Sequence, residues 1–198
     1  MTHSHAMDRR QLHGQLLSLA LAAEPVEEAI RDRMLALLDS TPDCFLRSCF
    51  PAHFTGSALV LSGDGQRTLL HHHTKLDRWL QFGGHCDGEE DVLEVARREA
   101  LEESGIAALV PAASRPFDLD IHQIPPRGEE PEHWHYDIRY VLIAPEDAPF
   151  LKSEESRELR WFTPEEMEKL PLDEGLQRLL RKWRRLLLHR TRPSTPSV

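Results

Sequence analysis

Cysteine and long apolar runs are both scarce in this chain of 198 residues. The three cysteines, Cys44, Cys49 and Cys86, are too few for a disulfide framework and favour a reducing compartment, so we expect a cytoplasmic location. Cys44 and Cys49 together with His53 match no common zinc-binding spacing. No apolar run approaches the ~20 residues that cross a bilayer. These absences argue against a disulfide-rich scaffold and against a helical membrane protein.

Positive charge is in the minority as well. The chain has 24 Lys and Arg against 33 Asp and Glu, a formal net charge of −9. Because an acidic surface repels a phosphate backbone, no nucleic-acid partner is expected. The final stretch differs, with seven Lys and Arg and no acid from Arg178 onward. Its leucines recur at helical spacing, which favours a helix packed onto its own domain. Binding to a membrane surface or to RNA is the less favoured alternative for this helix. We therefore expect no membrane partner.

Length and patterning predict one domain with an addition at each end. Residues 1–50 are assigned to an N-terminal helical extension, residues 51–190 to the main domain with its C-terminal helix, and residues 191–198 to a disordered tail. The first helix, residues 8–22, also imitates a secretory signal, but polar residues interrupt its apolar stretch and favour an amphipathic helix. A second helix begins at Pro25. These two helices are a candidate contact for a homodimer.

Periodicity indicates a mixture of strands and helices in the main domain. Strands are expected at residues 56–62, 67–73, 117–124, 133–144 and 158–163, the first two joined as a hairpin by Gly-Asp-Gly-Gln. Helices are expected from Glu89 to Gly105, after Thr163, and over residues 176–190. The three consecutive histidines at 71–73 cannot easily converge on one ion, because adjacent strand residues point to opposite faces. We expect them at an exposed strand end.

The stretch REALEESG at residues 98–105 concentrates carboxylates on one helix face. Glu99, Glu102 and Glu103 stand at i, i+3 and i+4, so their side chains are neighbours. At ~6 Å and an effective dielectric of ~20, each like-charge pair costs on the order of 3 kcal/mol. Hard divalent cations relieve this repulsion, and carboxylate oxygens suit Mg²⁺ or Mn²⁺. The pattern therefore predicts a metal-binding helix face.

The same stretch completes a longer motif. Gly84 is followed after five residues by Glu90, and after seven more by REALEESGI at residues 98–106. This resembles the Nudix box, GX5EX7REUXEEXGU, in which U is aliphatic. Every fixed position matches, and Ala100 is the one weak aliphatic residue. The segments WLQFGGHCDGEE and ELRWFT resemble the segments that flank the box in the family, although Phe82 stands where many members have proline.

The resemblance implies the α+β Nudix fold, an α/β/α sandwich with a mixed β-sheet. It also implies hydrolysis of the diphosphate bond in a nucleoside diphosphate linked to another group, by attack of a metal-activated water on phosphorus. The cofactor would be Mg²⁺ or Mn²⁺, and the partner a small-molecule nucleotide diphosphate derivative. A Nudix-fold sensor that binds such a derivative without cleaving it is the alternative. The box does not specify the substrate, because enzymes with many different leaving groups share it.

Residue roles follow from the resemblance. Glu99, Glu102 and Glu103 match the catalytic, metal-binding glutamates of the family. Arg98 matches an arginine that orients the site and pairs with the first glutamate of the box, here Glu90. Arg98 is therefore expected to support catalysis through its neighbours, and Glu90 to have a structural role.

Backbone and loop residues complete the expected site. The carbonyl of Gly83 or Gly84 is a candidate metal ligand, because glycine lets the backbone come close, and Gly105 ends the helix. The general base stays open. The candidates are Glu99 and Glu103 in the box and Glu154 and Glu155 on the loop before the last strand.

The expected strand at residues 133–144 carries a second polar group. Alternation places four residues on one face, namely His133, His135, Asp137 and Arg139. We interpret this face as a candidate substrate pocket; a transition-metal site on the two histidines, as in an oxygenase, and an ordinary half-exposed face are the alternatives. A similar face on the preceding strand consists of Asp118, Asp120 and His122. The two strands are expected to pair and to form one wall of a cleft.

Overall fold

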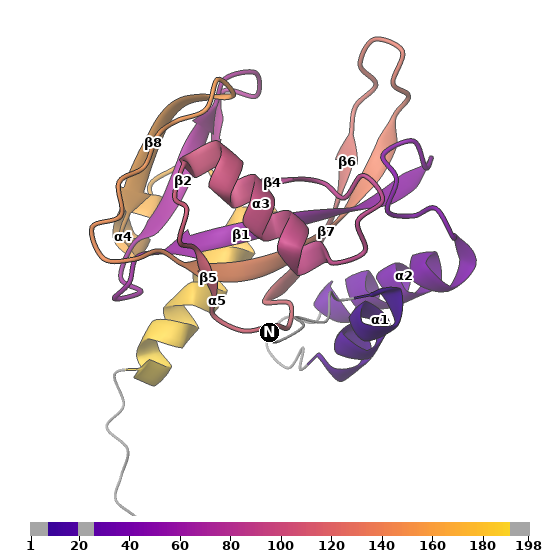
Figure 1. Cartoon of the computed structure of the whole chain (residues 1–198), viewed down its shortest axis with the longest axis horizontal. Helices are drawn as coiled ribbons and strands as arrows, with labels where there is room; N and C mark the ends of the chain where they lie inside the picture. The colour runs from indigo at the N-terminus through magenta and orange to yellow at the C-terminus, as the bar shows by residue number, and fades with distance from the viewer. Residues whose placement is uncertain (1–7, 20–25, 191–198) are drawn as a thin grey trace, which may run out of the picture.

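The computed structural model describes residues 8–19 and 26–190 (Figure 1). Its helices are α1 (Arg9–Ser18), α2 (Val26–Ser40), α3 (Val92–Ser104), α4 (Pro164–Met167) and α5 (Glu174–Arg190). Its strands are β1 (Ala52–Leu61), β2 (Thr68–His73), β3 (Arg78–Leu80), β4 (Phe82–His85), β5 (Val110–Pro111), β6 (Asp118–Ile124), β7 (His133–Ile143) and β8 (Ser156–Phe162). The predicted tail, the end of the predicted first helix and Pro25 lie outside the described residues.

The strands form one mixed sheet. At its centre β1 and β7 run parallel, in a register that begins with Ala52 opposite Trp134 and ends with Leu61 opposite Ile143. All other pairs are antiparallel: β1 with β2 and β4, β7 with β5 and β6, and β2 with β3 and β8. The two predicted hairpins, β1–β2 and β6–β7, are confirmed.

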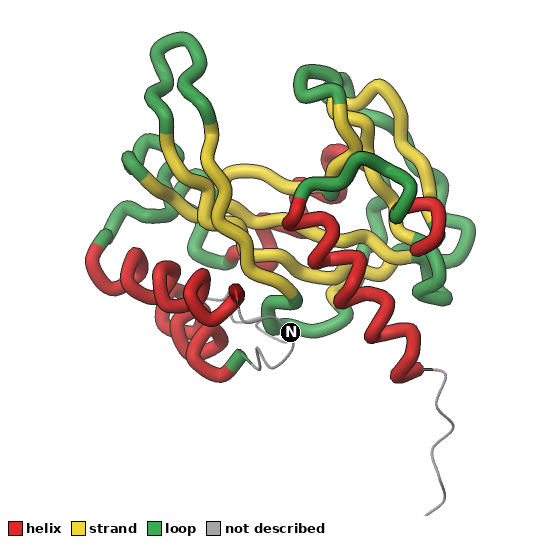
Figure 2. Tube along the Cα trace, turned by 180° about the vertical axis from the view of Figure 1, so that it is seen from behind, coloured by secondary structure: helices red, strands yellow, loops and turns green. Residues whose placement is uncertain are grey.

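Helices cover both faces of the sheet. In Figure 1 α3 crosses the near face, and in Figure 2, which shows the molecule from behind, α5 crosses the opposite face. One apolar core joins α1, α2 and α3 to the sheet and includes Leu12, Met34 and Phe54. A second core under α5 includes Leu179 and Trp183. The α+β class and the sandwich arrangement predicted from the sequence are therefore confirmed.

Local signals position α3. Asp91 caps its start, because its side chain accepts a hydrogen bond from the Glu94 amide at 3.1 Å. The helix ends at Gly105, whose φ of +71° is left-handed and favours glycine. Glu89 and Glu90 precede the helix, so the prediction that they form its first turn is wrong. Their carboxylates are nevertheless close to the positive end of the helix dipole.

The amphipathic helix α5 packs its apolar side onto the sheet, as expected. Trp183 is buried, and its indole Nε1 donates a hydrogen bond to the Gly65 carbonyl in the β1–β2 turn at 2.9 Å. Arg178, however, is only 3% exposed, because this basic residue faces the sheet and its acids. The apolar stripe therefore includes a buried charge that helical periodicity alone does not reveal.

The histidines of β2 do not form an exposed strand end, which corrects the prediction. His71 is 2% exposed and lies against the ring of Phe82, with Nδ1 2.9 Å from Ser156 Oγ. Burial lowers the pKa of His71 to about 4. His72 is partly buried on the opposite face and contacts Trp79. Adjacent histidines on a strand thus point to opposite faces, as expected.

Candidate active site

The acidic face of α3 lies against β4, and its three glutamates differ in environment. Glu103 is 8% exposed, Glu99 is half-buried and Glu102 is exposed. The helix brings them together because i, i+3 and i+4 positions share a face. The strand β4 brings the two consecutive glycines of the motif next to this face.

Glu103 is the most buried of the three. Its Oε2 accepts a hydrogen bond from the backbone amide of Gly83 at 3.1 Å. Burial raises the pKa of Glu103 to about 8, and the neighbouring charge of Glu99 contributes in the same direction. No basic side chain pairs with Glu103 among the residues that the structure describes. A desolvated carboxylate of this kind is stabilised by a nearby cation.

Glu99 lies directly against the second glycine. A Cβ atom added at Gly84 would fall 2.5 Å from Glu99 Oε2, which is closer than atoms can approach. The absence of a side chain at Gly84 therefore leaves room for the carboxylate beside the β4 backbone. The Glu99 carboxylate and the Gly84 backbone are therefore close neighbours.

Arg98 holds Glu99 in this position. Its Nη2 donates to Glu99 Oε1 at 2.8 Å and to the His85 carbonyl at 3.3 Å. The expected pairing of Arg98 with Glu90 is not found: Glu90 Oε2 accepts instead from the backbone amide of Arg9 in α1 at 3.1 Å. Arg98 thus contacts Glu99 and the β4 backbone rather than Glu90, and its orienting role stays a prediction.

An open cleft lies beside this face. Its volume is about 660 Å³. It is lined by Arg47, Cys86, Asp87, Gly88, Glu89, Arg98, Glu99 and Glu102. Arg47, in the segment before β1, and Asp87, in the turn that follows β4, form an exposed bidentate ion pair. The cleft is polar and charged, and it opens to solvent next to the glutamates.

The NUDIX domain model matches residues 52–183 of the chain. The chain belongs to the Nudix family. The match, the complete box and the fold together support the enzyme class predicted from the sequence, a Nudix pyrophosphohydrolase. No curated protein matches the sequence.

Solved Nudix structures share the fold. A NUDIX-family hydrolase from Clostridium perfringens is 21% identical, with a TM-score of 0.53, over 68% of this chain and 97% of its own. An Ap4A hydrolase from C. elegans is 18% identical, with a TM-score of 0.55, over 69% of this chain and 98% of its own. Identities this low show a common fold. They say nothing about the substrate of this Nudix chain.

The donor atoms of the Nudix box fit a hard divalent cation. Glu99, Glu102 and Glu103 offer carboxylate oxygens, and Gly83 and Gly84 offer backbone carbonyls. Mg²⁺ and Mn²⁺ prefer oxygen ligands of this kind. The buried Glu103 and the space kept open by Gly84 are the two structural features that support the fit.

The loop before β8 carries two glutamates that differ in their relation to the Nudix site. It is tied to the end of α3, because the Leu151 amide donates to the Ser104 carbonyl at 2.8 Å. Glu154 and Glu155 are both exposed in the turn that follows. After burial and Glu99, the charge of Glu155 also raises the pKa of Glu103. Glu155 is thus within electrostatic range of the box, which favours it over Glu154 as an additional ligand or base.

The predicted substrate face of β7 divides into two parts. Asp137 and Arg139 are 3% and 4% exposed, and Arg139 Nε donates to Asp137 Oδ2 at 2.8 Å. Asp137 also accepts from the hydroxyls of Thr55 and Ser57 on β1. This burial gives both residues a structural role, so we do not retain them in the proposed substrate pocket. His133 and His135 lie at the other end of the face, near His53 and His85.

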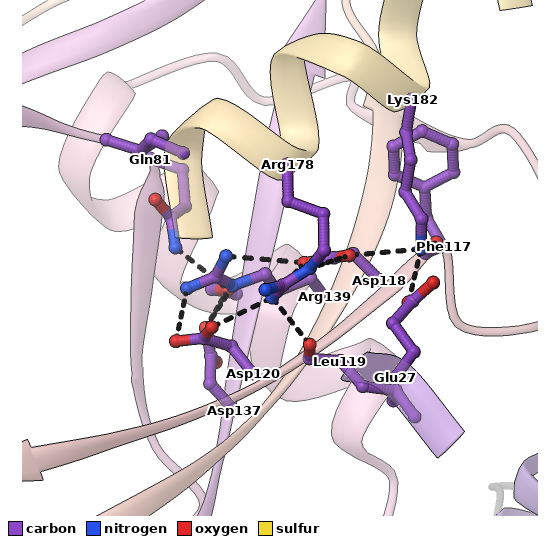
Figure 3. Close-up of polar contacts among 12 residues, drawn as sticks. Glu27, Gln81, Phe117, Asp118, Leu119, Asp120, Asp137, Arg139, Arg178 and Lys182 are labelled. Carbon is purple, nitrogen blue, oxygen red and sulfur yellow. Dashed lines mark hydrogen bonds and ion pairs between the residues drawn. The ribbon is translucent and has the colours of Figure 1, made fainter. Parts of the chain in front are cut away.

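A buried ion-pair network surrounds Arg139, and sequence reasoning missed it (Figure 3). Arg178 of α5 donates to Asp118 at 2.8 and 3.0 Å and to Asp120 at 2.8 Å. Lys182 pairs with Asp118 and with Glu27 of α2. The partners are far apart in the chain, so no spacing signals the network.

Charge pairing outweighs desolvation in this network. Burial alone would raise the pKa of Asp118 and of Asp120, but Arg139 and Arg178 more than offset it and hold both values below the ordinary range. The two aspartates therefore remain ionised and keep α5 joined to β6. The polar face of β6 predicted from the sequence serves mainly to attach this helix.

Proposed function

We propose that the chain is a metal-dependent Nudix hydrolase that cleaves the diphosphate bond of a nucleoside diphosphate linked to another group. The proposed ligands of Mg²⁺ or Mn²⁺ are the carboxylates of Glu99, Glu102 and Glu103 with a carbonyl of Gly83 or Gly84. The observation that carries the proposal is the complete box folded as one acidic face beside an open cleft. The C. elegans structure, an Ap4A hydrolase, makes Ap4A a reasonable test substrate.

The residues of the chain have separable roles in this proposal. When bound, the cation would lower the pKa of a water molecule and neutralise charge on the diphosphate. Arg98 orients Glu99 through its 2.8 Å contact and so fixes one wall of the site. Arg47 also lines the cleft, where a guanidinium suits a phosphate oxygen. Glu103 and Glu155 are the better-placed candidates for the general base.

The test is a panel of nucleoside diphosphate derivatives, including Ap4A, nucleotide sugars and nucleoside triphosphates, assayed with Mg²⁺ and with Mn²⁺. We expect metal-dependent release of a phosphorylated product. The Glu102→Gln and Glu103→Gln variants should lose about 100-fold or more in kcat, because even supporting residues of a metal site contribute about 10–100-fold. Glu94→Gln, which changes an exposed acid on the same helix, is the matched control.

Two results would contradict the proposal. Wild-type rates in both box variants would show that the glutamates do not form the reaction centre. Tight binding of a panel member without turnover, in the presence of either metal, would indicate the non-catalytic sensor instead.

A further inference from the structure

Histidines from three strands converge on the polar face of the sheet. His53 of β1, His85 of β4 and His135 of β7 each bring one ring nitrogen to a group whose members all lie within 4.8 Å of one another. The parallel register places His53 directly beside His135. His133, two residues earlier on β7, stacks on His53 with a ring-centroid distance of 5.0 Å. The group that converges within this distance consists of imidazoles alone.

His53 directs an unpaired acceptor into this group. Its Nδ1 lies 3.1 Å from the Cys49 carbonyl, and since a carbonyl only accepts, Nδ1 carries the proton. The other nitrogen, Nε2, then bears a lone pair. His53 is 1% exposed, and Nε2 is buried with no hydrogen-bond partner in the described part of the chain. A buried polar atom without a partner is costly and calls for an explanation.

His135 is oriented in a similar way through a neighbour. His133 Nδ1 lies 2.8 Å from the Pro131 carbonyl, so it carries the proton and Nε2 of His133 accepts. This Nε2 lies 3.2 Å from His135 Nε2, which must then be the donor and leaves Nδ1 of His135 as its lone pair. In metal sites the other ring N–H of a histidine is commonly fixed by a hydrogen bond to a carboxylate, a backbone carbonyl or water. At His135 the Nε2 of His133 takes that place.

From this geometry we propose that His53, His85 and His135 form a second metal site, for a borderline divalent transition metal represented by Zn²⁺. Three imidazoles with a fourth position open to solvent are a common Zn²⁺ arrangement, and imidazole also suits Cu²⁺, Ni²⁺ and Fe²⁺. The ion accepts the lone pair of His53 that nothing else in the described residues accepts. His85 and His135 are only half-buried, which leaves an entry path.

Protonation does not compete strongly with the metal at this position. Burial lowers the pKa of His53, and it lowers the pKa of His135 to about 2. Both rings are therefore neutral near pH 7, the form that binds a metal.

The histidine site is distinct from the acidic face of α3. A Cβ atom at Gly83 would point to Ser57, whereas one at Gly84 would point to Glu99. Successive strand residues alternate, so the side chain of His85 lies on the face of Ser57, opposite to Glu99. The two sites are back to back across β4 and differ in chemistry, nitrogen ligands on one side and carboxylate oxygens on the other. An ion at the histidines would join β1, β4 and β7 where β4 supplies the glycines of the box.

The test measures Zn²⁺ binding rather than activity. The full chain is stripped with a chelator, and Zn²⁺ is titrated in excess Mg²⁺ against a competing chromophoric chelator, with Co²⁺ as a spectroscopic probe of nitrogen coordination. We expect one tight equivalent in the wild type and a rise in Tm on addition of Zn²⁺. His85→Ala and His135→Ala should each weaken Zn²⁺ binding at least about tenfold, and circular dichroism confirms that they fold.

Two control variants separate this site from the others. His72→Ala, which removes a histidine of β2 outside the converging group, and Glu102→Gln, in the acidic face, should bind Zn²⁺ as the wild type does. Binding that is lost in Glu102→Gln and kept in the histidine variants would overturn the proposal, and so would the absence of a tight equivalent. Inorganic diphosphate that binds the metal-free protein and requires His85 and His135 would assign the cluster to an anion instead. None of these results depends on turnover, so the proposed hydrolase activity is judged separately.

Discussion

Glu103 shows at the scale of one residue how the fold prepares a site. A carboxylate that is 8% exposed loses most of its hydration, and the single amide of Gly83 replaces little of it. The pKa is accordingly raised to about 8 by burial. Gly84 contributes in another way, because its missing side chain admits Glu99 to the backbone of β4. The burial of Glu103 and the missing side chain of Gly84 therefore suit the binding of a ligand and contribute little to stability.

Gly84→Ala should raise the Mg²⁺ concentration that gives half-maximal activity by about 10–100-fold. The added Cβ would meet the Glu99 carboxylate at 2.5 Å, and this flexible group would move out of its position while the fold is kept. Gly14→Ala in α1, where the added Cβ meets nothing within 4 Å, is the control. An unchanged metal requirement in Gly84→Ala would remove Glu99 from the metal site.

Because of His71, the free energy of unfolding should fall as the pH is lowered into the acid range. Burial lowers its pKa from 6.5 to about 4, so the unfolded chain binds the proton first. The contribution of this pKa shift to the free energy of unfolding is complete above pH 6.5. It is lost as the pH falls towards 4, and the loss amounts to up to about 3 kcal/mol. We expect His71→Asn to flatten the fall in unfolding free energy between pH 7 and pH 4, measured by urea denaturation. His72→Asn should keep the wild-type slope, and equal slopes in all three proteins would contradict the assignment.

At the scale of elements, α5 is attached by two different kinds of contact. Its leucines and Trp183 cover the apolar face of the sheet, while Arg178 and Lys182 reach the acids of β6 and α2 (Figure 3). Hydrophobic burial supplies the binding energy of the helix. The ion pairs fix its position along the sheet, because Nε of Arg178 donates to Asp118 and its Nη2 lies within hydrogen-bond distance of Asp118, Asp120 and the Leu119 carbonyl.

Arg178→Ala should lower the free energy of unfolding by about 3–5 kcal/mol, because it leaves Asp118 charged, buried and without its main partner and removes one of the two arginines that pair with Asp120. Arg184→Ala on the same helix removes an exposed pair with Glu168, whose side chains are 35% and 61% exposed, and should cost about 0–1 kcal/mol. Chemical denaturation of the two variants compares them directly. Similar losses would mean that the buried network contributes no more than a surface pair.

At the scale of the molecule, the N-terminal helices share a core with the catalytic part. Leu12, Leu16 and Met34 have no exposed surface and belong to the same cluster as Phe54 and Tyr140 of the central strands. α1 also reaches the box, through the amide of Arg9 on Glu90. The extension is therefore packed as part of the fold, and the predicted homodimer contact stays a prediction. No helix in the described ranges is long and apolar enough to cross a bilayer.

Met34→Ala should destabilise the whole chain by about 2–5 kcal/mol, the usual cost of a cavity at a fully buried position. Because α2 shares its core with the sheet, unfolding should remain a single transition when followed by circular dichroism and by tryptophan fluorescence. Leu17→Ala, at a position 60% exposed, should change stability by no more than about 0.5 kcal/mol. Two separate transitions in Met34→Ala would show that the extension folds independently.

Local patterns predicted the helix of the box, but not the short strand β4 that carries Gly84. Gly105 and Thr163 mark helix ends through their own backbone and side-chain preferences, and alternation identified β6 and β7. The burial of His71 and the partner of Glu90 could not be predicted in this way. Both depend on residues distant in the chain, Ser156 and Arg9, whose approach no local pattern records.

The sequence alone determined the family, the acidic helix face and the class of cation it suits, because these follow from residue types at short, fixed spacing along one helix. Only the tertiary structure decided which polar residues are accessible. It buried Asp137 and Arg139 in the core and brought His53, His85 and His135 together. The physical reason is the parallel pairing of β1 with β7, which joins segments far apart in the chain and depends on the packing of the whole sheet.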